Sequence, residues 1–242
     1  MEDTSRSRKL HCAEDLRRRI LVEDLEPGRH LDEIELAEAY RISRPPLREV
    51  LRELAGEGYV VLTENRAAQV TPMSHRSLHQ FFIAAPMIYS AVSRLAALNA
   101  TPAQVTRLRA AQAAFRRAID EGDAAGCALG NERFHSIIGE MAQNLYLMPS
   151  LRRLLIDHAR IGMIFYDRRA THLASQRSQA ADDHDRFIAL IEAGDGQAAA
   201  DLAIAHWELS RAHIESFVAP PGLRVPLTRA ANTDQHEEAS AP

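Results

Sequence analysis

Three arginines spaced four residues apart are the first feature of this sequence that could do chemistry. Arg44, Arg48 and Arg52 lie within residues 43–52, and on a helix such side chains share one face. A guanidinium group presents a fork of N–H donors that fits guanine O6 and N7 or a phosphate. If this segment is helical, its arginine face is suited to bind nucleic acid.

A second set of residues could bind a metal ion. Asn131 and His135 are four apart and project from one helix face, while His184 and His206 come later in the chain. Three imidazoles and an amide oxygen from three helices could bind Zn²⁺ or a similar divalent ion with open positions left. A helical histidine is more often a surface or core residue, so spacing alone leaves both interpretations open.

The arginines need a helix-turn-helix to position them, and the pattern predicts one. Leu36, Ala37 and Tyr40 form a short apolar helix face. A second helix is predicted from apolar residues at a spacing of three and four, namely Leu47, Val50, Leu51 and Leu54. Ser43 is a suitable N-cap, and Pro45 and Pro46 fall in the first turn, where a missing N–H is tolerated.

Two short β runs follow, at residues 59–62 and 68–70, and predict the hairpin of a winged helix. After residue 72 the pattern becomes helical, with capping residues such as Ser74 and Thr101 and glycine stops at Gly122 and Gly194. Helices are expected at 75–98, 102–120, 123–142, 147–168, 175–193 and 196–217. The predicted fold is mainly α, with a winged helix-turn-helix of three helices followed by an antiparallel bundle of six or seven helices.

The composition suits an aliphatic helical protein, with 46% hydrophobic and 5% aromatic residues in 242. No secretion signal and no run near the ~20 apolar residues of a bilayer span is evident, so we expect a cytoplasmic protein without a membrane partner. Cys12 and Cys127 are too few for a disulfide framework.

The net charge is −4, and residues 1–72 alone carry −3. Any DNA binding must therefore depend on where the arginines lie and on two copies of the domain, with a strong salt dependence.

Residues 13–72 closely resemble the DNA-binding domain of GntR-type bacterial transcription regulators. The resemblance rests on Pro27-Gly28, residues 35–38 and 43–51, Gly58-Tyr59-Val60 and Asn65-Arg66. It implies a double-stranded DNA operator as partner, contacted by Ser43, Arg44, Pro45, Pro46, Arg48, Arg52, Asn65 and Arg66. Two positions depart from the family. Ile34 stands where some relatives carry an arginine, and Ala67 stands where the wing usually has glycine.

Residues 75–217 look like the all-helical FCD effector domain of the FadR subgroup of these regulators. Asn131-x-x-Phe134-His135, then His184, then His206 match its metal-site pattern in order and spacing. The resemblance implies a divalent metal on Asn131, His135, His184 and His206, with zinc expected and nickel or manganese as alternatives. It also implies a cavity beside the metal for a small organic acid whose carboxylate completes the coordination.

The usual carboxylate clamp of that cavity is missing, because Ala85 and Tyr89 stand where the family has arginine and glutamate. Pro86 between them should kink or split the helix. The candidate replacements that could contact an effector are Tyr89, Arg133, His158, Arg160 and Tyr166.

The expected domains are a flexible N-terminus (1–12), the DNA-binding domain (13–72), a short linker with the start of the first bundle helix (73–80), the effector domain (81–218) and a disordered tail (219–242). The expected function is a ligand-responsive regulator, a repressor or an activator, that binds an inverted-repeat operator as a homodimer. One alternative is a regulator whose helical domain is structural and does not sense. A more remote one is a three-His hydrolase, against which the absence of His-Glu-x-x-His, a Gly-rich phosphate loop and a nucleophile elbow argues.

Overall fold

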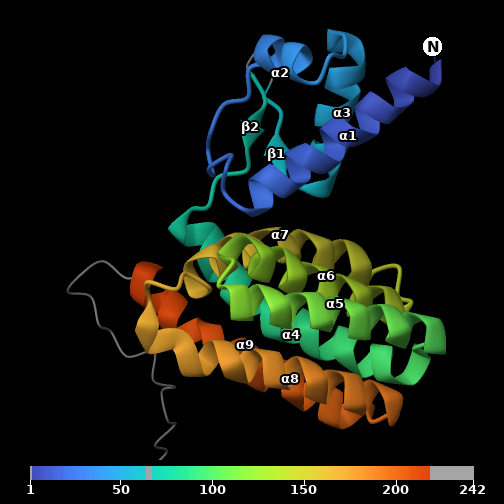
Figure 1. Ribbon diagram of the computed structural model, residues 1–242, viewed down its shortest axis with the longest axis vertical. Coiled ribbons are helices and arrows are strands. Elements are labelled where there is room, and N and C mark those ends of the chain that lie inside the picture. The colour runs from blue at the N-terminus through green and yellow to red at the C-terminus, as the bar shows by residue number, and fades with distance from the viewer. Residues whose placement is uncertain (1, 64–66, 219–242) are drawn as a thin grey trace, which may run out of the picture.

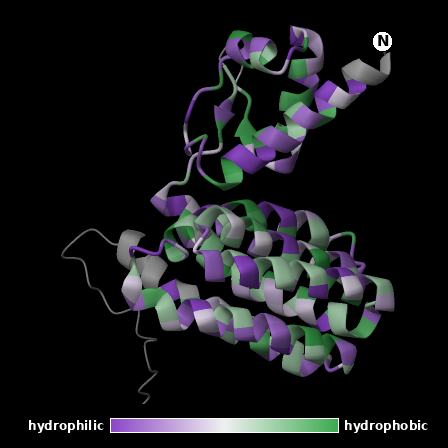
Figure 2. Ribbon diagram, in the orientation of Figure 1, coloured by the Kyte–Doolittle hydropathy of each residue, from purple (hydrophilic) through white to green (hydrophobic). Residues whose placement is uncertain are grey.

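The computed structural model describes residues 2–63 and 67–218. It contains a small N-terminal domain and a larger helix bundle, and the N-terminal domain lies against helix α7 of the bundle (Figure 1). The N-terminal elements are α1 (Glu2–Leu21), α2 (Glu33–Ala39), α3 (Arg44–Glu57), β1 (Val60–Val61) and β2 (Gln69–Val70). Apolar and polar residues alternate along the helices of both domains, as expected for helices with one buried face (Figure 2).

Helix α1 begins at Glu2, so the expectation of a flexible segment at residues 1–12 is wrong for residues 2–12. The local sequence has no apolar stripe that would predict a helix in this segment. Contacts with distant residues hold it instead: Arg8 donates to the carbonyl of Arg41, and Lys9 pairs with Glu49 at 2.7 Å. Cys12 is already fully buried against the domain core.

The N-terminal domain has its own core, to which α1, α2, α3 and both strands contribute. Helix α3 buries Leu47, Val50, Leu51 and Leu54 and ends at Gly58, whose φ of 94° lies in the left-handed region that glycine favours. The hairpin is antiparallel with Val60 opposite Val70, as a winged helix requires, although its strands are shorter than the pattern predicted.

The six predicted bundle helices are confirmed, with ends within three residues of those expected. They are α4 (His75–Asn99), α5 (Pro102–Glu121), α6 (Ala124–Ala142), α7 (Leu147–Phe165), α8 (Ala174–Glu192) and α9 (Gly196–Val218), with a 3₁₀ turn at Thr171–Leu173. Capping boxes start α4 at Ser74 and α5 at Thr101, and Gly122 and Gly194 adopt positive φ between helices.

Helix α4 is the central helix of the bundle and packs against α9, α6 and α7. It continues through Pro86, so the proline does not split it. Its buried face includes Phe81, Ala85, Tyr89 and Val92.

Among the described residues, α4 is the one helix that is long and apolar enough to cross a membrane, a property that core helices of soluble proteins share. The expectation that no stretch would reach that length and hydropathy was therefore wrong, because a central bundle helix is apolar for packing reasons.

The two domains meet through α7. Leu21 of α1 packs with Ile156 and Ala159, and Tyr59 lies against the same cluster. Arg160 is fully buried at this junction and donates to the carbonyl of Thr71 at 3.0 Å, in the segment that leads into α4. The domain junction is thus both apolar and hydrogen-bonded.

Candidate functional site

The predicted arginine face lies on the surface of α3. Arg44 and Arg48 are 57% and 52% exposed, and Arg52 is also exposed, whereas the opposite face of the helix is in the core. Ser43 occupies the N-cap position, but its side chain makes no capping hydrogen bond. Pro45 and Pro46 lie in the first turn. Both the Ser43 hydroxyl and the arginines are therefore accessible from solvent.

Glu33 of α2 lies beside these arginines. Its Oε2 atom is 2.9 Å from Arg48 Nε and 3.6 Å from Arg44 Nη2. A groove of about 620 Å³ separates the helix-turn-helix from the wing and is lined by Asp32, Glu33, Ile34, Arg44, Arg48, Leu51, Arg52, Leu62, Thr63 and Ala67. The arginine face is thus partly neutralised by an acidic residue that the sequence did not place there.

The wing residues Asn65 and Arg66 lie outside the described residues. Ala67 is described, and the non-glycine residues with positive φ in the described chain are Glu23, Arg41 and Gln143. Ile34 is 58% exposed on the groove wall, where it offers an apolar contact in place of a charge.

The predicted histidines converge inside the bundle. His135 of α6, His184 of α8 and His206 of α9 each offer a ligand atom, and these atoms all lie within 4.8 Å of one another. His184 is fully buried on α8. Its ring stacks on Phe134 with the centroids 3.9 Å apart and the planes 7° from parallel.

The donor atoms of this cluster fit a bound cation. Asn131 Oδ1, His135 Nε2 and His184 Nε2 are buried, and none has a hydrogen-bond partner among the described residues. A buried polar atom left without a partner costs about 1–3 kcal/mol, and a bound cation would supply the missing partner to all three atoms. Burial also lowers the pKa of His135 and His184 well below the usual value, which keeps both imidazoles neutral, as metal ligation requires.

Asp183 supports the third histidine. Its Oδ2 atom lies 3.4 Å from His206 Nδ1, and Gln179 Nε2 donates to Oδ1 at 2.9 Å. Desolvation raises the pKa of the Asp183 carboxyl, but the hydrogen bonds from His206 and Gln179 outweigh it, and the net pKa is lowered. The residue was visible in the sequence beside His184, but its role becomes clear only when α8 and α9 are packed.

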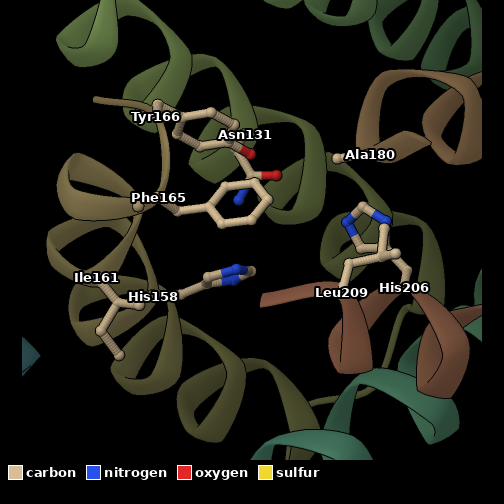
Figure 3. A pocket seen from close by; sticks show the side chains of 9 residues that line it. Asn131, His158, Ile161, Phe165, Tyr166, Ala180, His206 and Leu209 are labelled. Carbon is tan, nitrogen blue, oxygen red and sulfur yellow. The ribbon is translucent and has the colours of Figure 1, made fainter. Parts of the chain in front are cut away.

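A small cavity adjoins the cluster (Figure 3). It has a volume of about 20 Å³ and is lined by Asn131, His158, Ile161, Gly162, Phe165, Tyr166, Ala180, His206 and Leu209. A second cavity of about 10 Å³ is also lined by His158 and His206, together with residues that include Tyr89 and Trp207. Such volumes hold about one water molecule or ion. An organic acid would enter only after the surrounding side chains move.

Three of the five predicted effector residues line these cavities, namely Tyr89, His158 and Tyr166. The Tyr89 hydroxyl and His158 Nδ1 are hydrogen-bonded at 2.7 Å, and burial lowers the pKa of His158 to about 3. The other two predicted effector residues line neither cavity. Arg133 is exposed beside Glu140, and Arg160 faces the domain junction rather than the cavity.

Comparison with known proteins identifies both domains. Residues 9–70 match the bacterial regulatory proteins of the gntR family, and residues 87–209, half of the chain, match the FCD domain. The Nta operon transcriptional regulator of Aminobacter aminovorans is 30% identical over 53% of this chain and 60% of its own length, so the chain aligns with less than two thirds of that relative. The HTH-type transcriptional regulator YdhC of Bacillus subtilis (strain 168) is 22% identical over 83% of this chain and 88% of its own.

Solved structures show the same fold. McbR/YncC of E. coli aligns with a TM-score of 0.70 at 20% identity, over 87% of this chain and 96% of that one. A GntR regulator from Rhodococcus sp. RHA1 aligns with a TM-score of 0.63 at 20% identity, over 87% and 98%. These families and relatives are transcription regulators and not enzymes. The chain therefore belongs to the GntR family of bacterial transcription regulators, as a DNA-binding regulator with an FCD effector-binding domain.

Proposed function

We propose that this regulator binds an inverted-repeat operator as a homodimer in the cytoplasm, with one α3 helix in the major groove of each half-site. The exposed face with Arg44, Arg48 and Arg52 carries this proposal, because guanidinium groups near a helix N-terminus can reach base edges and phosphates. Two copies would double the contacts, which compensates for the acidic N-terminal domain.

The same proposal assigns the histidine cluster to a divalent metal, with zinc the expected ion. His135, His184 and His206 would hold it, and the unpartnered Asn131 Oδ1 would be the fourth protein ligand. The bound ion would supply a positive charge that attracts the carboxylate of a small organic acid. Asn131 is neutral, whereas an aspartate at this position would cancel one positive charge of the ion. The site would therefore attract an anion more strongly.

The effector would bind beside His158, Tyr89 and Tyr166. The described lining of the two cavities contains no arginine or lysine, so any carboxylate there would depend on the metal and on hydrogen bonds from these three side chains. The cavities are too small for more than an ion or a water, and binding an organic acid would therefore displace α7, from which His158 projects.

Helix α7 offers a route from the cavity to the DNA-binding domain. His158 faces the cavity, and two residues later Arg160 holds the carbonyl of Thr71. A movement of α7 would therefore change how the N-terminal domain is held. A coupling free energy of about 1–3 kcal/mol between the two arrangements would change operator affinity roughly 5- to 150-fold.

The DNA-binding proposal is tested with Arg48→Ala in a titration of operator DNA selected from a random pool. We expect specific binding to be lost while the circular dichroism spectrum and melting temperature stay unchanged, since Arg48 is exposed. Arg18→Ala is the matched control, because it removes an arginine that is 50% exposed on α1. Equal losses in both variants would remove α3 from its assigned role.

The metal proposal is tested by elemental analysis of the untagged protein beside a His135→Ala/His206→Ala double variant. We expect about one metal per chain in the wild type and none in the double variant. A wild type that takes up no metal after incubation with Zn²⁺, Ni²⁺ and Mn²⁺ would refute the assignment.

A second candidate is a regulator whose helical domain is structural and does not sense. Ala85 favours it, because this buried position lacks the arginine that the family resemblance would place there. A thermal-shift screen of small carboxylic acids separates the two. An effector should raise the melting temperature and also change DNA affinity, whereas a structural domain should show neither response.

A further inference from the structure

Gln112 is a buried polar residue on the otherwise apolar face of α5. It is 3% exposed, and its helix neighbours Leu108 and Phe115 are fully buried. It lines neither of the cavities beside the histidines. A buried amide must be hydrogen-bonded to be tolerated, so its partners indicate its role.

The partners fix the orientation of the amide. Gln112 Nε2 lies 2.7 Å from the carbonyl of Ala181 and 3.1 Å from Asp185 Oδ1. Both of these atoms only accept hydrogen bonds, so the NH₂ group must face them. The amide oxygen Oε1 then faces His184 Nδ1 at a distance of 2.9 Å.

This arrangement determines the tautomer of His184. An amide oxygen cannot donate, so His184 Nδ1 must carry the proton. The lone pair then lies on Nε2, the buried atom without a partner that belongs to the three-histidine cluster. The stacked ring of Phe134 limits the tilt of the imidazole, while the bond to Gln112 decides which edge of the ring faces the cluster.

We propose that Gln112 is a positioning residue that holds His184 in the Nδ1–H tautomer and so sets the affinity of the three-histidine site for a divalent cation. The role of Gln112 in cation affinity rests on the proposed metal function. His206 is oriented differently, by the carboxylate of Asp183. The site therefore combines one imidazole supported by an anion with one supported by a neutral amide, and the neutral partner makes His184 the less basic ligand.

The experiment compares Gln112→Leu, which removes the acceptor at similar volume, with Gln112→Glu, which keeps an acceptor facing Nδ1. Arg109→Ala is the control for loosened helix packing, because Arg109 pairs with Glu192 across the same α5–α8 contact at 2.6 Å. Zinc affinity is measured by competition with a chromophoric chelator. The ¹⁵N chemical shifts of the His184 side chain are measured in the metal-free protein.

We expect Gln112→Leu to weaken zinc binding by about 10- to 100-fold, the range for partners of metal-bound histidines. Its His184 should lose the Nδ1–H signature, whereas Gln112→Glu and Arg109→Ala should keep it. A Leu variant that retains both the signature and the affinity would overturn the proposal. If Gln112→Leu fails to fold, Gln112→Met takes its place, because methionine fits irregular space without supplying a comparable acceptor.

The two readouts separate this inference from the metal assignment. A wild type that binds no zinc refutes the metal function and with it the affinity role of Gln112, while the ¹⁵N shifts still decide whether Gln112 fixes the tautomer. A wild type that binds zinc but shows the Nε2–H tautomer refutes the positioning role and leaves the metal function intact.

Discussion

Replacing Glu33 with glutamine should increase operator affinity. Glu33 holds Arg48 at 2.9 Å and Arg44 at 3.6 Å, so DNA must compete with this carboxylate for the two guanidinium groups. Glutamine keeps the size of the side chain and removes its charge. The free arginines would then meet phosphate or guanine without first breaking an ion pair.

The size of the effect follows from the exposure of the pair. Arg48 is 52% exposed and Glu33 is 22% exposed, so the pair contributes in the range of about 0.2–1 kcal/mol found for solvent-exposed ion pairs. The proposed homodimer would break two such pairs on one operator, which gives about 0.4–2 kcal/mol. At about 1.4 kcal/mol per factor of ten, Glu33→Gln should bind roughly 2- to 30-fold more tightly.

Fluorescence anisotropy with a labelled operator at several salt concentrations would measure this gain. Glu38→Gln is the matched control, because Glu38 lies on the same helix and forms no ion pair within the described part of the chain. In an Arg44→Ala background, most of the gain from Glu33→Gln should remain, because only the longer of the two contacts of Glu33 is lost.

Two results would refute this reasoning. One is a gain from Glu33→Gln no larger than that from Glu38→Gln, which would reduce the effect to overall charge. The other is a gain that disappears in the Arg44→Ala background, which would show that Glu33 does not act through Arg48.

Three further predictions concern stability. Leu54→Ala, at a fully buried position of α3, should lower the free energy of unfolding of the N-terminal domain by about 2–5 kcal/mol in urea titrations, and an unchanged midpoint would contradict the packing of α3. Zinc at 100 times its dissociation constant should stabilise the wild type by about 2.7 kcal/mol in thermal melts and leave His184→Ala unaffected. Asp157→Asn should lower the free energy of unfolding by about 3–5 kcal/mol, because it leaves the buried Arg160 without its carboxylate partner. Arg153→Ala, which removes the exposed partner of Asp157, should lower it by less than about 1 kcal/mol.

Much of this protein was predictable from its sequence because the relevant signals are local. The apolar spacing of Leu47, Val50, Leu51 and Leu54 determines which side of α3 enters the core, and so which side presents Arg44 and Arg48. Helices α5 and α8 end next to Gly122 and Gly194, and α4 and α5 begin after the capping residues Ser74 and Thr101, as predicted. These features depend on neighbours within about four residues, a distance over which helix geometry is regular.

Tertiary structure decided which polar groups meet. Arg133 and Arg160 were equally good candidates for the effector cavity, yet the first faces solvent and the second faces the domain junction. Helix α1 extends back to Glu2, and its N-terminal half contacts residues far along the chain, as in the pair of Lys9 with Glu49, forty residues away. The start of that helix has no local signal of comparable strength.

The histidine site shows the same division. The sequence by itself determined that His135 and Asn131 share a helix face, because a separation of four residues allows no other arrangement on a helix. That His184 is buried and bonded to Gln112, 72 residues away, was decided by the packing of α5 against α8. Periodicity along one helix identifies its buried face but carries no information about which residue of another helix lies opposite, because that depends on the angle and register at which two surfaces interlock.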